Sequence, residues 1–415
     1  MVSYIVPVAG ATVISSDTTI GGSGVVSSFT NLIVTNSATL TVASGTLMNA
    51  NNIIVNSGAA ITLNGVTLII NATLQNLGTV TSSDATDSIW IYDIRNVGTM
   101  SVAGTMVLRD NITQDMTGTI EGAGTLTLDG DVIVKSNSTL SIASVGGIGT
   151  LEIAAGQTLT IGGNSTFTID TISGTGALSV SSGFTLTLGA NYTFTATTPT
   201  LTGTGSLSVS SGFTLALSVN YTFTFSTVSG AGTLSIASGD TLTIGANLTF
   251  SITTVSGAGT LSVLSGDTLT IGANLTLGIT TVSGAGTLSV SSGDTLTIGV
   301  NSTFSIATVS GAGTLSVSSG DTLTIGSNST FTVSTVSGAG TLSIASGDTL
   351  TIGANLTFSI TTVASYVPPD TSALTTTAPL SNIDTVEPPG TSVVPDSTTV
   401  PPAEERDDGA ATMES

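Results

Sequence analysis

One seven-residue block recurs along the second half of this chain at a constant interval. Ser229-Gly-Ala-Gly-Thr-Leu-Ser235 returns at Ser256, Ser283, Ser310 and Ser337, each copy starting 27 residues after the last. A strict period of this size indicates one supersecondary unit stacked on copies of itself rather than a globular core. We therefore expect a solenoid, whose function must be sought in the columns that its stacked copies form.

One repeat contains three short stretches in which polar and apolar residues alternate. They are Thr233-Leu-Ser-Ile236, Thr241-Leu-Thr-Ile244 and Thr249-Phe-Ser-Ile252, separated by glycine-containing turns. Alternation with period two is typical of β-strands that bury one face. The pattern predicts an all-β fold, a three-sided parallel β-helix with 27 residues per coil. A coil of this length favours a right-handed helix.

If each coil is one repeat, every residue stacks on its equivalent in the next copy. The expected aromatic column inside the tube is Leu140, Phe167, Phe194, Phe223, Phe250, Leu277, Phe304, Phe331 and Phe358. The expected outward double file of threonines is Thr158/Thr160, Thr185/Thr187, Thr241/Thr243, Thr268/Thr270, Thr295/Thr297, Thr322/Thr324 and Thr349/Thr351. The expected acidic column is Asp240, Asp267, Asp294, Asp321 and Asp348.

Both outward columns have ordinary structural interpretations. Threonine is a good strand residue, and Ser and Thr cover the other faces almost as densely. An aspartate column could hold calcium, but Phe184 and Phe213 occupy its positions in earlier copies. We therefore read the aspartates as solvated turn residues and predict no metal site. Ice binding by the threonine file, as in some antifreeze solenoids, is a second alternative for function.

Composition divides the chain into four parts. Residues 1–20 are expected to cap the open end, residues 21–118 to form irregular coils, and residues 119–363 to form the regular repeat. Residues 364–415 are rich in Thr, Pro and acids and are expected to be a disordered tail, because they cannot bury enough apolar area to order themselves. The first residues lack a basic segment and contain Pro7, so no cleaved signal peptide is expected.

The charge balance excludes several classes of partner. The chain has 4 Lys and Arg against 25 Asp and Glu, a formal net charge of −21. A nucleic-acid partner is not expected, because binding nucleic acid requires a basic stripe. The chain contains no His and no Cys, which rules out disulfides, Cys/His zinc sites and a Ser-His-Asp triad. We predict no cofactor, and no apolar run is long enough for a membrane span.

One patch departs from the Ser/Thr monotony of the surface. It contains the only tryptophan, Trp90, together with Tyr92 and Arg95, which are candidate carbohydrate contacts. The other polar members of the patch are Asp84, Asp87, Asp93, Arg109 and Asp110. Two acids could hydrolyse a glycosidic bond, but no spacing in the sequence sets their separation. We therefore predict that the protein is not an enzyme.

The most regular polar column consists of asparagines, each followed by any residue and then Thr. Its members are Asn137, Asn164, Asn191, Asn220, Asn247, Asn274, Asn301, Asn328 and Asn355. Asn-x-Thr is the acceptor sequence for N-glycosylation. The same column could instead be an inward ladder of amides that bond coil to coil. In the absence of a signal peptide we favour the ladder, and we treat the ladder and the glycan as mutually exclusive.

The repeat Ser-Gly-Ala-Gly-Thr-Leu-Ser-Val/Ile, followed by Ser-Gly-Asp-Thr-Leu-Thr-Ile-Gly, resembles the repeats of parallel β-helix surface proteins. Autotransporter passengers, filamentous adhesins and fibre proteins of large DNA viruses look similar. The resemblance implies a rigid structural fibre on a virion or a cell surface, one that mediates attachment. Its implied partners are glycans, other surface or capsid proteins, or further copies of the chain. The alternative is a carbohydrate-binding or polysaccharide-cleaving β-helix.

Overall fold

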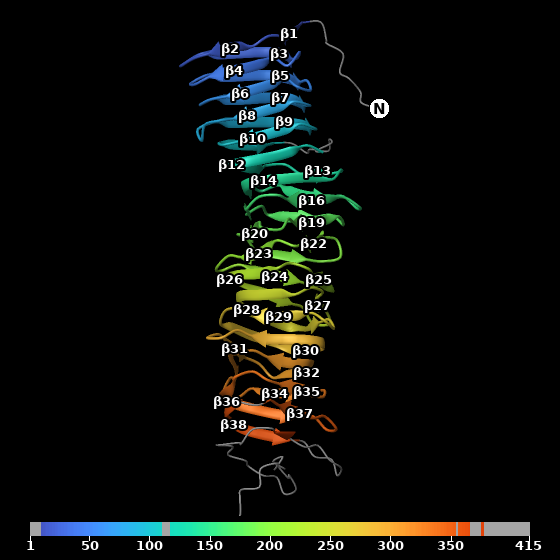
Figure 1. Ribbon diagram of the computed structural model, residues 1–415. Coiled ribbons are helices and arrows are strands. Elements are labelled where there is room, and N and C mark those ends of the chain that lie inside the picture. Colours follow the sequence, from blue (N-terminus) through green and yellow to red (C-terminus); the bar gives the residue numbers. More distant parts are fainter. Residues whose placement is uncertain (1–9, 110–116, 354–355, 366–374, 377–415) are drawn as a thin grey trace, which may run out of the picture.

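The protein is an elongated stack of parallel β-strands. The structure, a computed structural model, describes residues 10–109, 117–353, 356–365 and 375–376. Every regular element in these residues is a strand, and the strands follow one another along a single axis from β1 (Ala11–Ile14) to β38 (Thr357–Ser365) (Figure 1). Adjacent layers pair in parallel and about 21 residues apart, which gives a β-solenoid of about 16 turns. The predicted all-β solenoid is confirmed.

The strands are short, and most of them contain fewer than eleven residues. The first coils consist of β2 (Thr18–Gly21), β3 (Val26–Val34), β4 (Thr39–Ala43), β5 (Leu47–Val55), β6 (Ala60–Leu63), β7 (Thr67–Asn76), β8 (Thr79–Ser82), β9 (Ser88–Asn96), β10 (Thr99–Val102) and β11 (Thr105–Leu108). The middle coils consist of β12 (Thr119–Leu128), β13 (Val132–Val134), β14 (Ser138–Gly146), β15 (Thr150–Ile153), β16 (Thr158–Ile161), β17 (Ser165–Phe167), β18 (Thr171–Ser173), β19 (Ala177–Val180), β20 (Thr185–Leu188), β21 (Tyr192–Phe194), β22 (Thr200–Gly203), β23 (Ser206–Val209), β24 (Thr214–Leu217) and β25 (Tyr221–Phe223). The last coils consist of β26 (Thr227–Ile236), β27 (Thr241–Ile244), β28 (Leu248–Val263), β29 (Thr268–Ile271), β30 (Leu275–Val290), β31 (Thr295–Ile298), β32 (Ser302–Ser310), β33 (Thr314–Val317), β34 (Thr322–Ile325), β35 (Ser329–Phe331), β36 (Thr335–Ile344), β37 (Leu350–Ile352) and β39 (Thr375–Thr376).

One coil closes after three strand segments. The end of β26, residues 233–236, forms the first side, β27 forms the second, and the start of β28, residues 248–250, forms the third. The chain then returns to the first side, where Thr254 pairs with Thr233. Likewise Thr260 pairs with Thr241 on the second side, and Leu269 pairs with Leu248 on the third. The predicted three sides are therefore present.

The predicted coil of 27 residues is wrong, because one sequence repeat contains four strand segments and one coil uses only three. The fourth segment is Thr254-Val-Ser256, which pairs with residues 276–278 of the next coil. It is too short to stand out as an alternating stretch, yet Val255 is fully buried. Three repeats therefore wind through four coils, and equivalent residues of successive repeats lie on different sides of the rod.

The Gly-Ala-Gly stretch also differs from its predicted role as a turn. In β28 it lies inside one continuous strand, where the register with β30 shifts between Gly257 and Thr260. The shift is a β-bulge, which bends the strand around a corner of the solenoid without ending it. Gly257 has φ +114, a conformation that L side chains rarely adopt, so the bulge requires glycine here.

The interior is a continuous column of buried aliphatic and aromatic side chains. The predicted aromatic column is wrong, since Phe250 lies between Val228 of the preceding coil and Ile271 of the next. All three side chains are at most 1% exposed. Phenylalanines of successive repeats therefore lie on different sides, and Phe250 stacks on aliphatic residues. In the middle coils, Phe223 also contacts the rings of Tyr221 and Phe225. This mixture still fills the tube, because every segment of the repeat places apolar residues inward.

The strands near the two ends of the solenoid can be compared with the predicted cap, irregular coils and tail. β1 pairs with β3, and β2 pairs with β4, so the first coil begins within the segment expected to be a cap. The coils of residues 21–108, irregular in sequence, are paired as continuously as the later ones. Of the expected tail, the structure describes only the end of β38 and β39. The rest of the tail lies outside the described residues, and the right-handed sense stays a prediction.

Candidate functional site

The aromatic patch lies on one outward face of the early coils. In β9, Ile89 and Ile91 point inward and are fully buried, which places Trp90 and Tyr92 outward. Both aromatic side chains are half-buried. Trp90 pairs with Ile69 in the preceding coil and with Val107 in the next. An apolar outward stripe therefore interrupts the Ser/Thr surface at this point.

Arg109 is the residue that organises the patch. Its guanidinium carbon lies 4.2 Å from the centre of the Trp90 ring, a cation–π contact. Nη1 donates to the Tyr92 hydroxyl at 3.4 Å, and Nε lies 4.0 Å from Oδ2 of Asp129. The indole Nε1 donates to Oγ of Ser88 at 2.7 Å. These contacts hold the aromatic rings in place, but they also occupy one face of Trp90.

Arg95 lies on the same strand as the two aromatic residues, beyond an irregularity in its pairing. The register of β9 against β7 shifts between the pairs at Ile91 and Asp93, and Arg95 lies beyond this shift, paired with Gln75. We named Trp90, Tyr92 and Arg95 as candidate carbohydrate contacts; the structure adds Arg109, which contacts both aromatic side chains, and the part played by Arg95 stays a prediction. Arg109 was expected in the same patch, but its contact with the two rings could not be predicted, because Arg109 follows β11 in the next coil.

The acids of the patch have structural partners. Asp87 is 2% exposed, and its Oδ1 accepts from the backbone N–H of Val66 at 2.6 Å while its Oδ2 accepts from that of Asp84 at 3.0 Å. Asp84 accepts from the backbone N–H and the hydroxyl of Thr86, and these bonds hold the pKa of Asp84 below its ordinary value. Asp110 lies outside the described residues. The contacts of Asp87 suit a residue that joins coils rather than an acid–base catalyst.

The asparagines of the regular column are exposed and bond coil to coil, in a geometry that differs from the inward amide ladder we favoured. Asn247 is exposed, and its Oδ1 accepts from the backbone N–H of Thr268 in the next coil at 2.9 Å. The bond does join coil to coil, but it runs from asparagine to backbone rather than from amide to amide. Seven further asparagines make the equivalent bond, namely Asn137, Asn164, Asn191, Asn220, Asn274, Asn301 and Asn328. Asn355 lies outside the described residues.

A true asparagine ladder does exist, but in the early coils and inside the protein. Asn76 and Asn96 are both fully buried, and Nδ2 of Asn76 donates to Oδ1 of Asn96 at 2.8 Å. Each Nδ2 also donates to a backbone carbonyl one coil further on, at Thr99 and Thr119. Our sequence reasoning missed this ladder. The spacing of Asn56, Asn76 and Asn96 at intervals of 20 residues was the available signal.

The threonine double file and the acidic column are both wrong as predicted. Asp240, Asp267 and Asp294 lie at three successive corners, since their carbonyls accept from Thr260, Thr287 and Thr314 on three different sides. The threonines instead form a ladder of five on each side of the rod. The ladders are Thr214–Thr233–Thr254–Thr276–Thr297, Thr241–Thr260–Thr281–Thr303–Thr324 and Thr268–Thr287–Thr308–Thr330–Thr351.

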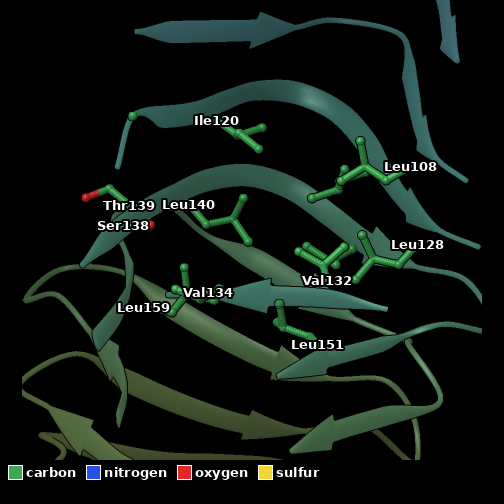
Figure 2. A pocket seen from close by; sticks show the side chains of 13 residues that line it. Leu108, Ile120, Leu128, Val132, Val134, Ser138, Thr139, Leu140, Leu151 and Leu159 are labelled. Atoms are coloured by element: carbon green, nitrogen blue, oxygen red, sulfur yellow. The ribbon is translucent and has the colours of Figure 1, made fainter. Parts of the chain in front are cut away.

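A small apolar cavity lies inside the tube where the early coils meet the regular ones. Its volume is about 40 Å³, and Figure 2 shows Leu128, Val132 and Leu151 among the side chains around it. The wall is almost wholly aliphatic, so the space offers no polar partners for bound water. The cavity is a packing defect in the core rather than a ligand site.

A wider groove of about 400 Å³ opens on the surface beside Pro199, where the repeat contains an insertion. Threonine hydroxyls and Tyr221 line it, and no charged residue does. The Tyr221 hydroxyl donates to the carbonyl of Pro199 at 2.8 Å, and burial raises the pKa of this tyrosine. Tyr221 therefore anchors the insertion to the coil, and its hydroxyl is already engaged.

Comparison of the chain with protein-family models, with curated proteins and with solved structures finds no match. Within the described ranges, no three His, Cys, Asp or Glu side chains are grouped so that they could hold a metal ion. The part of the chain that the structure describes also contains no helix with the length and hydrophobicity to cross a bilayer.

Proposed function

We propose that this protein is a structural rod, a surface or fibre component displayed on a virion or a cell. The observation that carries the proposal is the mismatch between four strand segments in a repeat and three in a coil. A solenoid that binds or catalyses along one side needs the same residues stacked on that side. Here the mismatch distributes each repeated residue over all three sides. Additional repeats therefore lengthen the rod without building one uniform binding face.

The described core and surface support this role. Buried aliphatic and aromatic residues run through every coil, and parallel pairing continues from β1 to β38. At a strand spacing of about 4.8 Å, about 16 turns give a rod on the order of 75 Å long. Each side presents neutral Thr and Ser hydroxyls, which suits a rod that holds surfaces apart. The single double file of threonines that suggested ice binding is replaced by a ladder of five threonines on each side, so ice binding stays a second alternative.

Labelling in the native source tests the proposal. Gold-tagged antibodies against the rod are expected to label the outer surface of intact virions or cells. A variant with residues 256–336 duplicated adds three repeats, hence four coils, and should move a tag at the far end outward by about 19 Å. Labelling confined to the cell interior, with no label on the outer surface, would contradict the proposed role.

Carbohydrate binding at Trp90 is the second candidate, because two outward aromatic rings are held rigid by Arg109. Stacking on an aromatic ring is how apolar sugar faces are bound. If the patch binds a glycan, Trp90→Ala should abolish binding on a glycan array, and Arg109→Ala should weaken it because the rings lose their support. Arg95→Ala tests the third predicted contact, and unchanged binding would exclude Arg95 from the site. Binding that survives Trp90→Ala would move the site elsewhere.

A further inference from the structure

Eight exposed asparagines share one geometry and one sequence context. In each, Oδ1 accepts from a backbone N–H of the next coil, at 2.7 to 2.9 Å. Each is also the first residue of an Asn-x-Thr sequence. The middle residue points into the core, as with Leu248, which is 2% exposed, so the asparagine is held at the corner with its side chain in solvent.

The two ends of the asparagine amide have separate roles in this geometry. The coil-to-coil bond uses Oδ1 alone, as an acceptor. An N-linked glycan is attached to Nδ2, and the linked amide keeps its carbonyl oxygen as an acceptor. Structural bonding and glycosylation are therefore compatible at one side chain. The exclusion that we assumed from the sequence does not hold.

We propose that these eight asparagines are acceptors of N-linked glycans and that each keeps its coil-to-coil bond when modified. In the transfer, Nδ2 attacks the anomeric carbon of a sugar carried on a pyrophosphate donor. The bond between that carbon and the phosphate oxygen breaks, and the pyrophosphate leaves with the electron pair. A base on the transferase takes the displaced Nδ2 proton. The inference concerns the surface of the rod and does not depend on its proposed role.

The winding of the chain would arrange these glycans around the rod. Asn247, Asn274 and Asn301 bond to Thr268, Thr295 and Thr322, which lie on the third, first and second sides. Asn328 returns to the third side, four coils beyond Asn247. Sites at one corner are therefore about 19 Å apart at the strand spacing of a sheet. This spacing leaves room for a glycan at every site.

A coat of glycans would keep neighbouring rods from associating side by side. Only 7% of the residues are charged, and the described sides are covered mainly by Ser and Thr. The formal net charge of −21 makes neighbouring rods repel one another, but salt screens this repulsion beyond about 10 Å. Glycans at all three corners would hold neighbouring rods at a distance without adding charge.

Site mapping on the full chain from its native source tests the proposal. Cleavage with a peptide N-glycosidase in heavy-oxygen water marks each formerly glycosylated asparagine as a labelled aspartate, which is read by peptide mass spectrometry. We expect labels at half or more of the eight sites. Labels at fewer than half of them would overturn the proposal.

Variants at one site separate the two roles of the amide. Asn247→Asp keeps an oxygen acceptor and removes Nδ2, so it should lose the glycan while hydrogen exchange at the Thr268 N–H stays unchanged. Asn247→Ala should lose the glycan and also speed that exchange about fivefold, because the N–H loses its partner. Thr249→Ser keeps the acceptor sequence and is the control that should retain the glycan. Retention of the glycan in Asn247→Asp would contradict the assignment.

Discussion

Replacing Gly257 with alanine is expected to open the solenoid at one corner. A Cβ at this position would lie 2.0 Å from the carbonyl oxygen of Ile236 and 2.9 Å from its backbone nitrogen and carbonyl carbon. These atoms belong to the main chain of the adjacent coil, so they can retreat only if the two coils separate. The positive φ of +114 adds backbone strain. We expect a loss of stability above about 4 kcal/mol, the range of exceptional substitutions.

Gly266 provides the matched control for this substitution. It also has a positive φ, +88, but a Cβ there would meet nothing within 4 Å. Gly266→Ala should therefore cost only the backbone strain, about 1 kcal/mol. Thermal denaturation followed by circular dichroism should show a much larger fall in midpoint for Gly257→Ala. Equal falls would mean that contact between coils is not the cause.

Phe250→Ala is expected to have the second-largest effect. The side chain is fully buried between Val228 and Ile271, and its removal leaves a void that spans two coils. Truncation of a buried phenylalanine typically costs about 3–5 kcal/mol. The stability of a solenoid is approximately a sum of terms between neighbouring coils, so the loss should be local. Hydrogen exchange should quicken most in the strands that pair with residues 248–250.

Phe184 is the control for Phe250, since it is 37% exposed at a turn of an earlier coil. Phe184→Ala should change the thermal midpoint and the exchange rates only slightly. If the two phenylalanine variants were equally stable, burial between coils would not be the source of the stability of Phe250.

Much of the fold can be predicted from this sequence, because alternation reports directly on which residues face inward. Leu242 and Ile244 were expected inside and are fully buried, while Thr241 and Thr243 point outward. The length of the coil could not be predicted in the same way. The period of the sequence reflects the four strand segments in one repeat. The length of a coil depends instead on the number of segments that complete one turn of the solenoid, which is three. The segment at Val255 is short, and the bulge at Gly257 looks like a turn.

The candidate sites were less predictable because they join residues from different coils. Trp90 and Tyr92 stand out in the sequence, but their contact with Arg109 depends on the pairing of β9 with β11. The part played by Asp87, a buried acceptor for two backbone N–H groups, likewise depends on a residue one coil away. The assumed coil length decides which residues of adjacent coils are neighbours. The predicted acidic column and threonine file are therefore wrong for the same reason.

Disulfide trapping tests the mismatch between repeat and coil most directly. The chain has no cysteine, so a disulfide can form only between two that are introduced. Thr270 and Ser289 are direct partners on adjacent strands, and the strand spacing of about 4.8 Å falls within the Cα range of disulfides. The double variant Thr270→Cys, Ser289→Cys is expected to cross-link readily under mild oxidation. The double variant Thr270→Cys, Thr297→Cys joins equivalent residues of successive repeats, which lie on different sides, and should stay reduced. Cross-linking of the second pair and not of the first would show that one repeat forms one coil and would contradict the account.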